Sequence, residues 1–173
     1  MEYFKRSPDA EVVLILTNNP QAYVLQRADN FEIPSHVFTR NEFYQTDDVI
    51  RMLKTLQVDL IVLAGFLWLV PASLLNAFPN KIINLHPALL PKFGGKGMYG
   101  DNVHKAVLEA GEEESGITIH FANVEFDEGE IIHQSRFKIE PSDYLEMIKF
   151  KGQQLEHQHF PRVIESLLKK MKS

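Results

Sequence analysis

Apolar residues gather in short runs along the first half of the chain, and polar turns separate these runs. Runs without alternation are typical of strands buried on both faces of a parallel sheet. They lie at 11–17, 60–64 and 81–85. The segments between them predict helices at 23–28, 46–56 and 71–77 and a short strand at 36–38. Strands that alternate with helices predict an α/β fold with a Rossmann-like, mostly parallel twisted sheet flanked by helices.

The second half of the chain is more polar. Its predicted elements are, in order, a glycine-rich loop at 93–100, a helix at 102–110 closed by Gly111, a strand at 116–121, a turn at 127–129, a strand at 131–139 and a helix from about 142 that is interrupted near Pro161. The strand at 116–121 alternates, so we expect it to be half exposed, with Thr118 and His120 on one face. Neither a repeat nor a linker interrupts the pattern, which predicts one domain over residues 1–173.

Composition and charge narrow the class of protein. The 173 residues are 45% hydrophobic and 24% charged, which suits a domain with a substantial core. A net charge of −5 gives no basic surface for nucleic acid, so we expect small-molecule partners, among which anions remain open. The sequence contains no cysteine, which excludes disulfides, a thiolate nucleophile and cysteine-ligated metals.

The segment 60–78 is nearly long and apolar enough to suggest a membrane span. It contains Gly65 and Pro71, and its β-branched beginning is typical of a buried strand, so we interpret it as a strand followed by a short helix. The first residues, Met1–Ser7, lack the apolar core of a signal peptide. We therefore expect a soluble, cytoplasmic protein with no membrane partner.

The most informative segment is Asn84-Leu85-His86-Pro87, where a predicted strand ends. Successive strand residues point to opposite faces, so Asn84 and His86 share one face, and Pro87 stops the strand. An amide can stabilise an oxyanion and an imidazole can move a proton near neutral pH, as attack on a carbonyl requires. Alternatively, the two side chains only cap the strand.

Asp127 offers a carboxylate for this site. Asp127 and Gly129 suit a hairpin turn without any further role. In the functional interpretation, the carboxylate lies near His86 and stabilises the imidazolium. The sequence alone does not decide whether Asp127 reaches His86, so both interpretations stay open.

Two other patterns resemble binding motifs but lack the context that these motifs need. Residues 95–100 fit G-x-G-x-x-G, yet a proline-ended segment precedes them in place of a strand, which argues against dinucleotide binding. His157 and His159 are two apart on a predicted helix, so they do not face each other, and no ligand set is complete around them. We expect no metal.

Three segments, taken in order, resemble the 10-formyltetrahydrofolate-dependent formyltransferases. They are Asn84-Leu85-His86-Pro87-Ala88-Leu89-Leu90-Pro91, Gly116-Ile117-Thr118-Ile119-His120-Phe121 and Asp127-x-Gly129. The segments 58–66 and 153–161 also resemble this family, so the likeness covers nearly the whole chain. It implies a formyltransferase fold and an enzyme that transfers a formyl group from 10-formyltetrahydrofolate to the amine of phosphoribosylglycinamide in de novo purine biosynthesis.

The resemblance also implies catalytic roles. Asn84 would orient the formyl oxygen and stabilise the oxyanion. His86 would act as general acid toward the tetrahedral intermediate, and Asp127 would keep His86 charged. His120 would support this cluster.

Binding roles follow from the same resemblance. Gln153 and Glu156 would face the glycinamide substrate, with Glu156 near its amine. The folate-contacting residues would be Arg40, Leu67, Trp68, Leu69, Val70, Asn84, Asn123, Val124, Glu125, Phe126 and Asp127.

The chain departs from the family at its start. Family members begin with a strand and a Gly-Ser-Gly-type loop at a helix N-terminus, where N–H groups would bind the substrate's phosphate. Met1–Ser7 resembles the end of that helix, so we expect this strand and the phosphate loop to be missing. Either the sequence is shortened, or a variant refills the gap by rearrangement or by association with another copy as a homodimer.

Two other functions stay open. A formyltetrahydrofolate hydrolase would use the same catalytic residues with water as the acceptor, although Gln153 and Glu156 favour an amine. A catalytically impaired remnant would only bind folate.

Overall fold

A computed structural model gives the structure of the protein and describes residues 1–172. These residues form two compact units: Met1–Asp59 with the residues from Leu168 onward, and Leu60–Leu167. Strands and helices alternate along the chain, which confirms the α/β class. The prediction of one domain over residues 1–173 stays a prediction.

The first unit joins two parallel strands to short helices. Its elements are the 3₁₀ helix η1 (Glu2–Arg6), β1 (Ile15–Thr17), α1 (Tyr23–Asn30), β2 (Ser35–Val37), α2 (Arg40–Tyr44) and α3 (Asp48–Thr55). Ile15 of β1 lies opposite Ser35 of β2. The predicted helices at 23–28 and 46–56 and the strand at 36–38 are therefore confirmed, with ends shifted by a few residues.

The sequence reasoning missed α2. A capping box begins this helix: Thr39 Oγ1 accepts a hydrogen bond from the N–H of Glu42, and the Glu42 carboxylate accepts one from the N–H of Thr39. The buried Phe43 stacks on Phe38, with ring centroids 5.1 Å apart. This local capping and packing fixes a helix too short for a periodic pattern to show.

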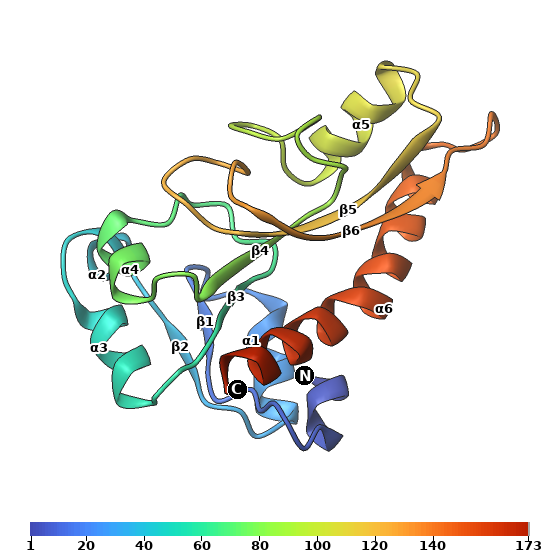
Figure 1. Ribbon diagram of the computed structural model, residues 1–173. Coiled ribbons are helices and arrows are strands. Elements are labelled where there is room, and N and C mark those ends of the chain that lie inside the picture. The colour runs from blue at the N-terminus through green and yellow to red at the C-terminus, as the bar shows by residue number, and fades with distance from the viewer. Residues whose placement is uncertain (173) are drawn as a thin grey trace. The chain divides into compact units, whose positions relative to one another are not determined.

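The second unit is built on a four-stranded sheet in the order β3-β4-β5-β6. Its elements are β3 (Ile61–Leu63), α4 (Ala72–Ala77), β4 (Ile82–His86), α5 (Asp101–Glu109), β5 (Glu114–Phe121), β6 (Ile131–Lys138) and α6 (Leu145–Met171). β3 and β4 are parallel, whereas β4, β5 and β6 pair antiparallel. In Figure 1, α5 lies on one side of the β5–β6 ribbon and the first turns of α6 lie on the other.

The strands predicted to be buried on both faces are shorter and more exposed than expected. β1 begins only at Ile15, and in β3 Val62 exposes 37% of its surface. Within residues 1–172, β1 pairs with β2 alone and β3 with β4 alone. A strand at the edge of a sheet has a neighbour on one side only, so more of its surface is exposed than in a central strand.

Two further expectations are wrong. The strand at 116–121, expected to be half exposed, is buried almost throughout as part of β5. The chain after β4 covers one of its faces: Thr118 is fully buried, and its hydroxyl donates to the carbonyl of Ala88. α6 also continues through Pro161 without interruption. Phe160 and Ile164 are buried on either side of the proline, so packing outweighs the loss of one backbone hydrogen bond.

None of the helices among residues 1–172 is long and apolar enough to cross a membrane. The segment 60–78, whose length and apolar composition suggested a membrane span, forms β3, a loop and α4.

Candidate functional site

The register between β4 and β5 brings four polar side chains to one face of the sheet. Asn84 lies opposite His120, and His86 lies opposite Thr118. Directly opposite residues of an antiparallel pair project to the same face. Asn84, His86 and His120 therefore face the same side, as the two-residue spacing of Asn84 and His86 predicted.

Asp127 reaches this face from the turn between β5 and β6. Its φ is +59°, a left-handed conformation that aspartate adopts more readily than most residues. Its Oδ2 lies 3.4 Å from Nδ1 of His86, and its Oδ1 lies 3.6 Å from Nε2 of His120. Nδ2 of Asn84 donates to Oδ1 over 3.4 Å. The structure thus brings all four candidate catalytic side chains together, and Asp127 is both a turn residue and a neighbour of His86.

Burial and hydrogen bonding shift the pKa of Asp127 in opposite directions. Its side chain exposes only 10% of its surface, and this burial raises its pKa. Hydrogen bonds from His120 and His86, the charge of His86 and the N–H of Gly95 outweigh burial and hold the pKa of Asp127 well below its usual value. A fixed negative charge therefore stands beside His86 at neutral pH.

Both ring nitrogens of His86 face oxygen acceptors. Nδ1 faces the Asp127 carboxylate, and Nε2 lies 2.8 Å from the carbonyl oxygen of Phe93. A neutral imidazole carries one N–H donor, whereas the imidazolium carries two and satisfies both acceptors. The imidazolium is also the form that a general acid needs.

The second histidine has a different pattern. Nδ1 of His120 donates to the carbonyl oxygen of Phe121 over 2.9 Å. Its Nε2 lies 3.2 Å from Nδ2 of Asn84, so the neutral ring accepts a hydrogen bond there. When protonated, Nε2 can donate to Asp127 instead. His120 thus orients the amide of Asn84.

Buried hydrogen bonds fix the chain that leaves the site after His86. The hydroxyl of Thr118 donates to the carbonyl of Ala88 and accepts from the N–H of Leu90. The side-chain amide of Gln134 donates to Thr118 Oγ1 and to the carbonyl of Leu90, each over 2.9 Å. The sequence signal for Thr118 was its shared face with His120, but the role of Gln134 was missed.

A comparison with family models matches residues 1–164 to the one described as formyl transferase. The match covers most of both compact units and includes all four clustered side chains. The chain belongs to the formyl transferase family. The resemblance found in the sequence is thereby confirmed.

Phosphoribosylglycinamide formyltransferases are among the relatives in this family. The chloroplastic one of Arabidopsis thaliana is 40% identical over 166 residues, which cover 93% of this chain and 57% of the Arabidopsis protein. The one of Haemophilus influenzae is 38% identical over 160 residues, covering 90% of this chain and 73% of that protein. The chain thus spans just over half of the first relative and nearly three quarters of the second.

A solved formyl transferase has the same fold. The crystal structure of phosphoribosylglycinamide formyltransferase from Bacillus halodurans matches with a TM-score of 0.84 at 34% identity. The match covers 98% of this chain and 87% of that one. The Rossmann-like α/β fold predicted from the sequence is the fold of this family.

The residues expected to contact folate lie in several places. Leu67 is 54% exposed in the loop after β3, whereas Val70 is buried. Asn123 and Val124 line a recess of about 280 Å³ beside α4. Arg40, in the first unit, lies over the ring of Tyr44 at 5.0 Å. Neither this recess nor a cavity of about 580 Å³ at residues 89–93 is lined by the four clustered side chains.

The remaining predicted folate contacts lie in two loops, one between β3 and α4 and the other between β5 and β6. Trp68 packs edge-on against Phe66, with ring centroids 6.2 Å apart, and Leu69 is half-buried beside it. In the second loop, the N–H of Glu125 donates to Asn123 Oδ1, and Phe126 leads directly into Asp127. Whether these side chains contact folate stays a prediction.

The two expected substrate residues lie on α6. Gln153 is exposed and Glu156 is half-buried. Burial raises the pKa of Glu156, and the charge of His157 opposes this only in part. Glu156 stands between the buried Gly152 and Phe160, each one turn away on the helix.

Sequence reasoning also missed His104 on α5. It is 7% exposed, and within residues 1–172 its Nδ1 has no hydrogen-bond partner. Its Cε1 lies 3.9 Å from the place a Cβ would take at Gly152. Burial, followed by the charge of Lys149, lowers the pKa of His104. In the sequence, His104 is a histidine between the apolar positions 103 and 107. Buried histidines with a purely structural role show the same pattern, so the sequence did not single it out.

The structure gives no sign of a metal centre. Across residues 1–172, no group of three or more histidine and acidic side chains could hold a metal ion.

Proposed function

We propose that this chain transfers the formyl group of 10-formyltetrahydrofolate to the amine of phosphoribosylglycinamide in de novo purine biosynthesis. The observation that carries the proposal is the buried contact of His86 and Asp127 beside Asn84, in a chain of the formyl transferase family. The names of the two relatives support phosphoribosylglycinamide as the acceptor of a formyl group. The folate donor is the one that the family resemblance implies. A chain with this activity acts on soluble small molecules, and we place it in the cytoplasm.

Asn84 is placed to stabilise the oxyanion. In the free chain its Nδ2 points at Nε2 of His120 and at Oδ1 of Asp127, over 3.2 and 3.4 Å. The bond to Asp127 is long and therefore weak, so one amide hydrogen can turn to a substrate oxygen at little cost. Such a donor stabilises the charge that develops when an amine adds to a formyl carbon.

His86 supplies the proton. Its Nδ1 faces a charged carboxylate and its Nε2 faces a neutral carbonyl. Because a hydrogen bond between charged groups is stronger, Nε2 is the nitrogen that can exchange its acceptor for the substrate oxygen. Asp127 then keeps the ring charged until the proton is needed.

The whole reaction balances without a covalent enzyme intermediate. 10-Formyltetrahydrofolate supplies the formyl carbon; a bond forms from the amine nitrogen to that carbon, and the bond from the carbon to the folate nitrogen breaks. One proton leaves the amine and one reaches the departing nitrogen. The side chains of the cluster mediate this proton transfer, and alignment of the two reactants further accelerates the reaction.

The binding residues are part of the same proposal. We assign the exposed Leu67 with Trp68, Leu69 and Val70 to one wall of the pterin site, and the loop 123–127 to another. Arg40 is assigned to the folate as well. Gln153 and Glu156 are assigned to the glycinamide, and the half-buried carboxylate of Glu156 gives its amine a partner of opposite charge.

A formyl-transfer assay separates this function from the alternatives. We expect purified chain to form formylated ribotide when both substrates are present and to release little formate when the amine is left out. Formate release that does not depend on the amine would indicate a hydrolase. Neither product, with folate still bound, would indicate a remnant, and both of these results contradict the proposal.

A further inference from the structure

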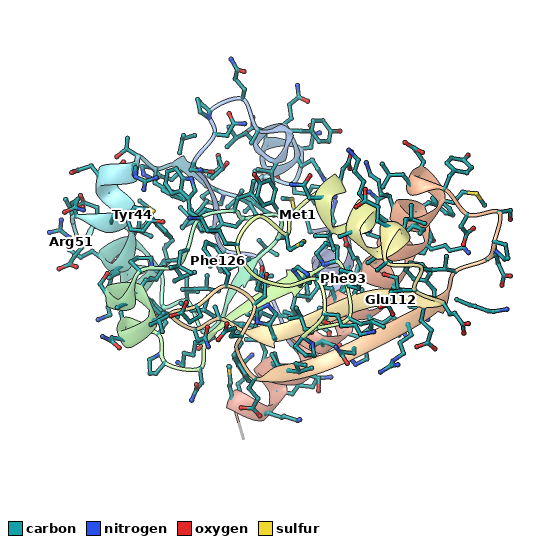
Figure 2. All side chains as sticks on the ribbon, turned by 90° about the horizontal axis from the view of Figure 1, so that it is seen from above. Met1, Tyr44, Arg51, Phe93, Glu112 and Phe126 are labelled. Atoms are coloured by element: carbon teal, nitrogen blue, oxygen red, sulfur yellow. The ribbon has the colours of Figure 1, made fainter. Side chains whose placement is uncertain are left out.

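We propose that the backbone of Phe93–Gly95, here called the strap, is a positioning element that holds His86 and Asp127 in their reactive arrangement. The catalytic consequence of this inference rests on the proposed function, whereas the contacts themselves are present in the chain without any substrate. Figure 2 labels Phe93 on the strap and Phe126 on the loop that leads into Asp127.

The strap contacts both side chains of the pair through main-chain atoms. The carbonyl oxygen of Phe93 accepts from Nε2 of His86 over 2.8 Å. The N–H of Gly95 donates to Oδ2 of Asp127 over 3.0 Å, and this same oxygen faces Nδ1 of His86. In the free chain both nitrogens of the imidazole therefore have a partner, and the N–H of Gly95 orients the carboxylate oxygen that faces Nδ1. When His86 donates its proton, the Phe93 carbonyl gives way to the substrate oxygen, while the contact through Asp127 remains.

A side chain at Gly94 would crowd both Leu90 and Asp127. A Cβ at Gly94 would stand 2.6 Å from Cδ2 of Leu90 and 3.2 Å from Cβ of Asp127. Glycine at this position lets the backbone approach the carboxylate, which is the usual reason for glycine where a backbone meets a site.

Two residues of the strap have positive φ values, and so does Asp127, which the strap contacts. Phe93 has a φ of +56° and Gly95 one of +93°, while Asp127 has +59°. A bulky residue in the left-handed region persists only where its surroundings hold it, and such residues cluster at functional sites. The two non-glycine residues in this conformation at the site belong to the two segments that meet there.

Gly95→Ala and Gly97→Ala form a matched pair for the test. Their φ values are +93° and +91°, and a Cβ at either position meets nothing within 4 Å. Only Gly95 donates to Asp127. Alanine keeps the backbone N–H, but a φ of +93° is strained for it, so in Gly95→Ala we expect the backbone to shift and the bond to Asp127 to weaken. A hydrogen bond to a charged group is worth about one factor of ten, so kcat should fall by about tenfold with KM little changed. Gly97→Ala should retain the wild-type kcat.

The titration of the Asp127 carboxyl group, followed by NMR in the free protein, gives a readout that needs no activity. The N–H of Gly95 helps to hold the pKa of Asp127 below its usual value, so in Gly95→Ala the midpoint should move to higher pH, while in Gly97→Ala it should stay. In the Asp127→Asn background, Gly95→Ala should have no further effect on kcat. Equal effects of the two alanine variants on kcat and on the titration overturn the proposal.

The amide proton of Gly95 provides a measurement that leaves the strap unchanged. We expect its exchange with solvent to be at least about tenfold faster in Asp127→Asn than in the wild type. Equal exchange rates contradict the contact. If the wild-type chain transfers no formyl group, the proposed function fails, while the titration and the exchange still decide on the strap.

Discussion

Nδ1 of His86 lies 3.4 Å from Oδ2 of Asp127, and each side chain exposes at most one tenth of its surface. The two residues come from the end of β4 and from the turn that follows β5. In a site with so little water, the carboxylate acts on the imidazole with less screening than at a surface. The proposed acid chemistry therefore depends on this contact.

Asp127→Asn keeps the shape of the side chain and removes its charge. We expect formyl transfer to fall by about 10²–10⁴-fold, the usual contribution of a positioned proton donor, because His86 loses the charged carboxylate that faces its Nδ1. The measurement is kcat with both substrates. Glu128→Gln, an exposed carboxylate in the same turn, is the control and should retain the wild-type rate.

The same variant has a pH dependence of stability with a definite sign. The pKa of Asp127 is lower in the folded chain than its usual value of about 4. Its ionised form therefore stabilises the fold above about pH 4, and this contribution is lost as the pH falls through the lower folded value. Asp127→Asn should be less stable than the wild type at about pH 7, and urea unfolding should show the two converging below about pH 4.

Asn84→Ala removes the donor proposed for the oxyanion. We expect a loss of about 10²–10³-fold in kcat, as for other oxyanion donors, with a smaller change in KM. Ala at Asn76, an exposed residue of α4, is the matched control. An equal rise in KM with kcat unchanged would mean that Asn84 binds substrate without acting on the transition state.

Thr118→Val tests the buried bonds that hold the chain after His86. The substitution leaves the carbonyl of Ala88 and the N–H of Leu90 without their partner. We expect a loss of about 1–3 kcal/mol in the free energy of unfolding, measured by chemical denaturation. Thr118→Ser keeps the hydroxyl and should lose less; a serine variant as unstable as the valine variant would assign the effect to packing.

Glu156→Gln should be more stable than the wild type at alkaline pH. Burial raises the pKa of Glu156 in the folded chain. A carboxyl group with a raised pKa favours the fold while protonated, and that contribution is lost as the pH rises through the folded value. Thermal unfolding should therefore show a gain for the variant at about pH 8 that vanishes near pH 4, below the usual glutamate pKa. A gain that persists at pH 4 contradicts this origin.

The sequence could predict the shared face of Asn84 and His86, because the two-residue period of a strand needs no knowledge of the fold. The residues by themselves could not show that Asp127 reaches His86; only the family resemblance implied it. That contact depends on the register of β5 against β4, which sets Asn84 opposite His120. Strand register follows from the packing of the whole sheet, and a single sequence records it only indirectly.

The sequence predicted a glycine-rich loop at 93–100, but it did not predict that this loop contacts His86 and Asp127. Phe93 and Gly95 act through a carbonyl and an N–H, which every residue carries, so their letters do not show the contact. Helix α6 was misjudged at Pro161 because a local rule was applied where tertiary packing decides. By contrast, the existence and order of most helices and strands followed from the apolar pattern alone.

The rate of ribotide formylation by His86→Asn tests the central claim most directly. Asparagine keeps a polar side chain of similar reach but cannot donate a proton as an acid. We predict at least about a hundredfold lower kcat than in the wild type, with the thermal unfolding curve showing a folded protein. A folded His86→Asn protein that formylates the ribotide at the wild-type rate would contradict the account.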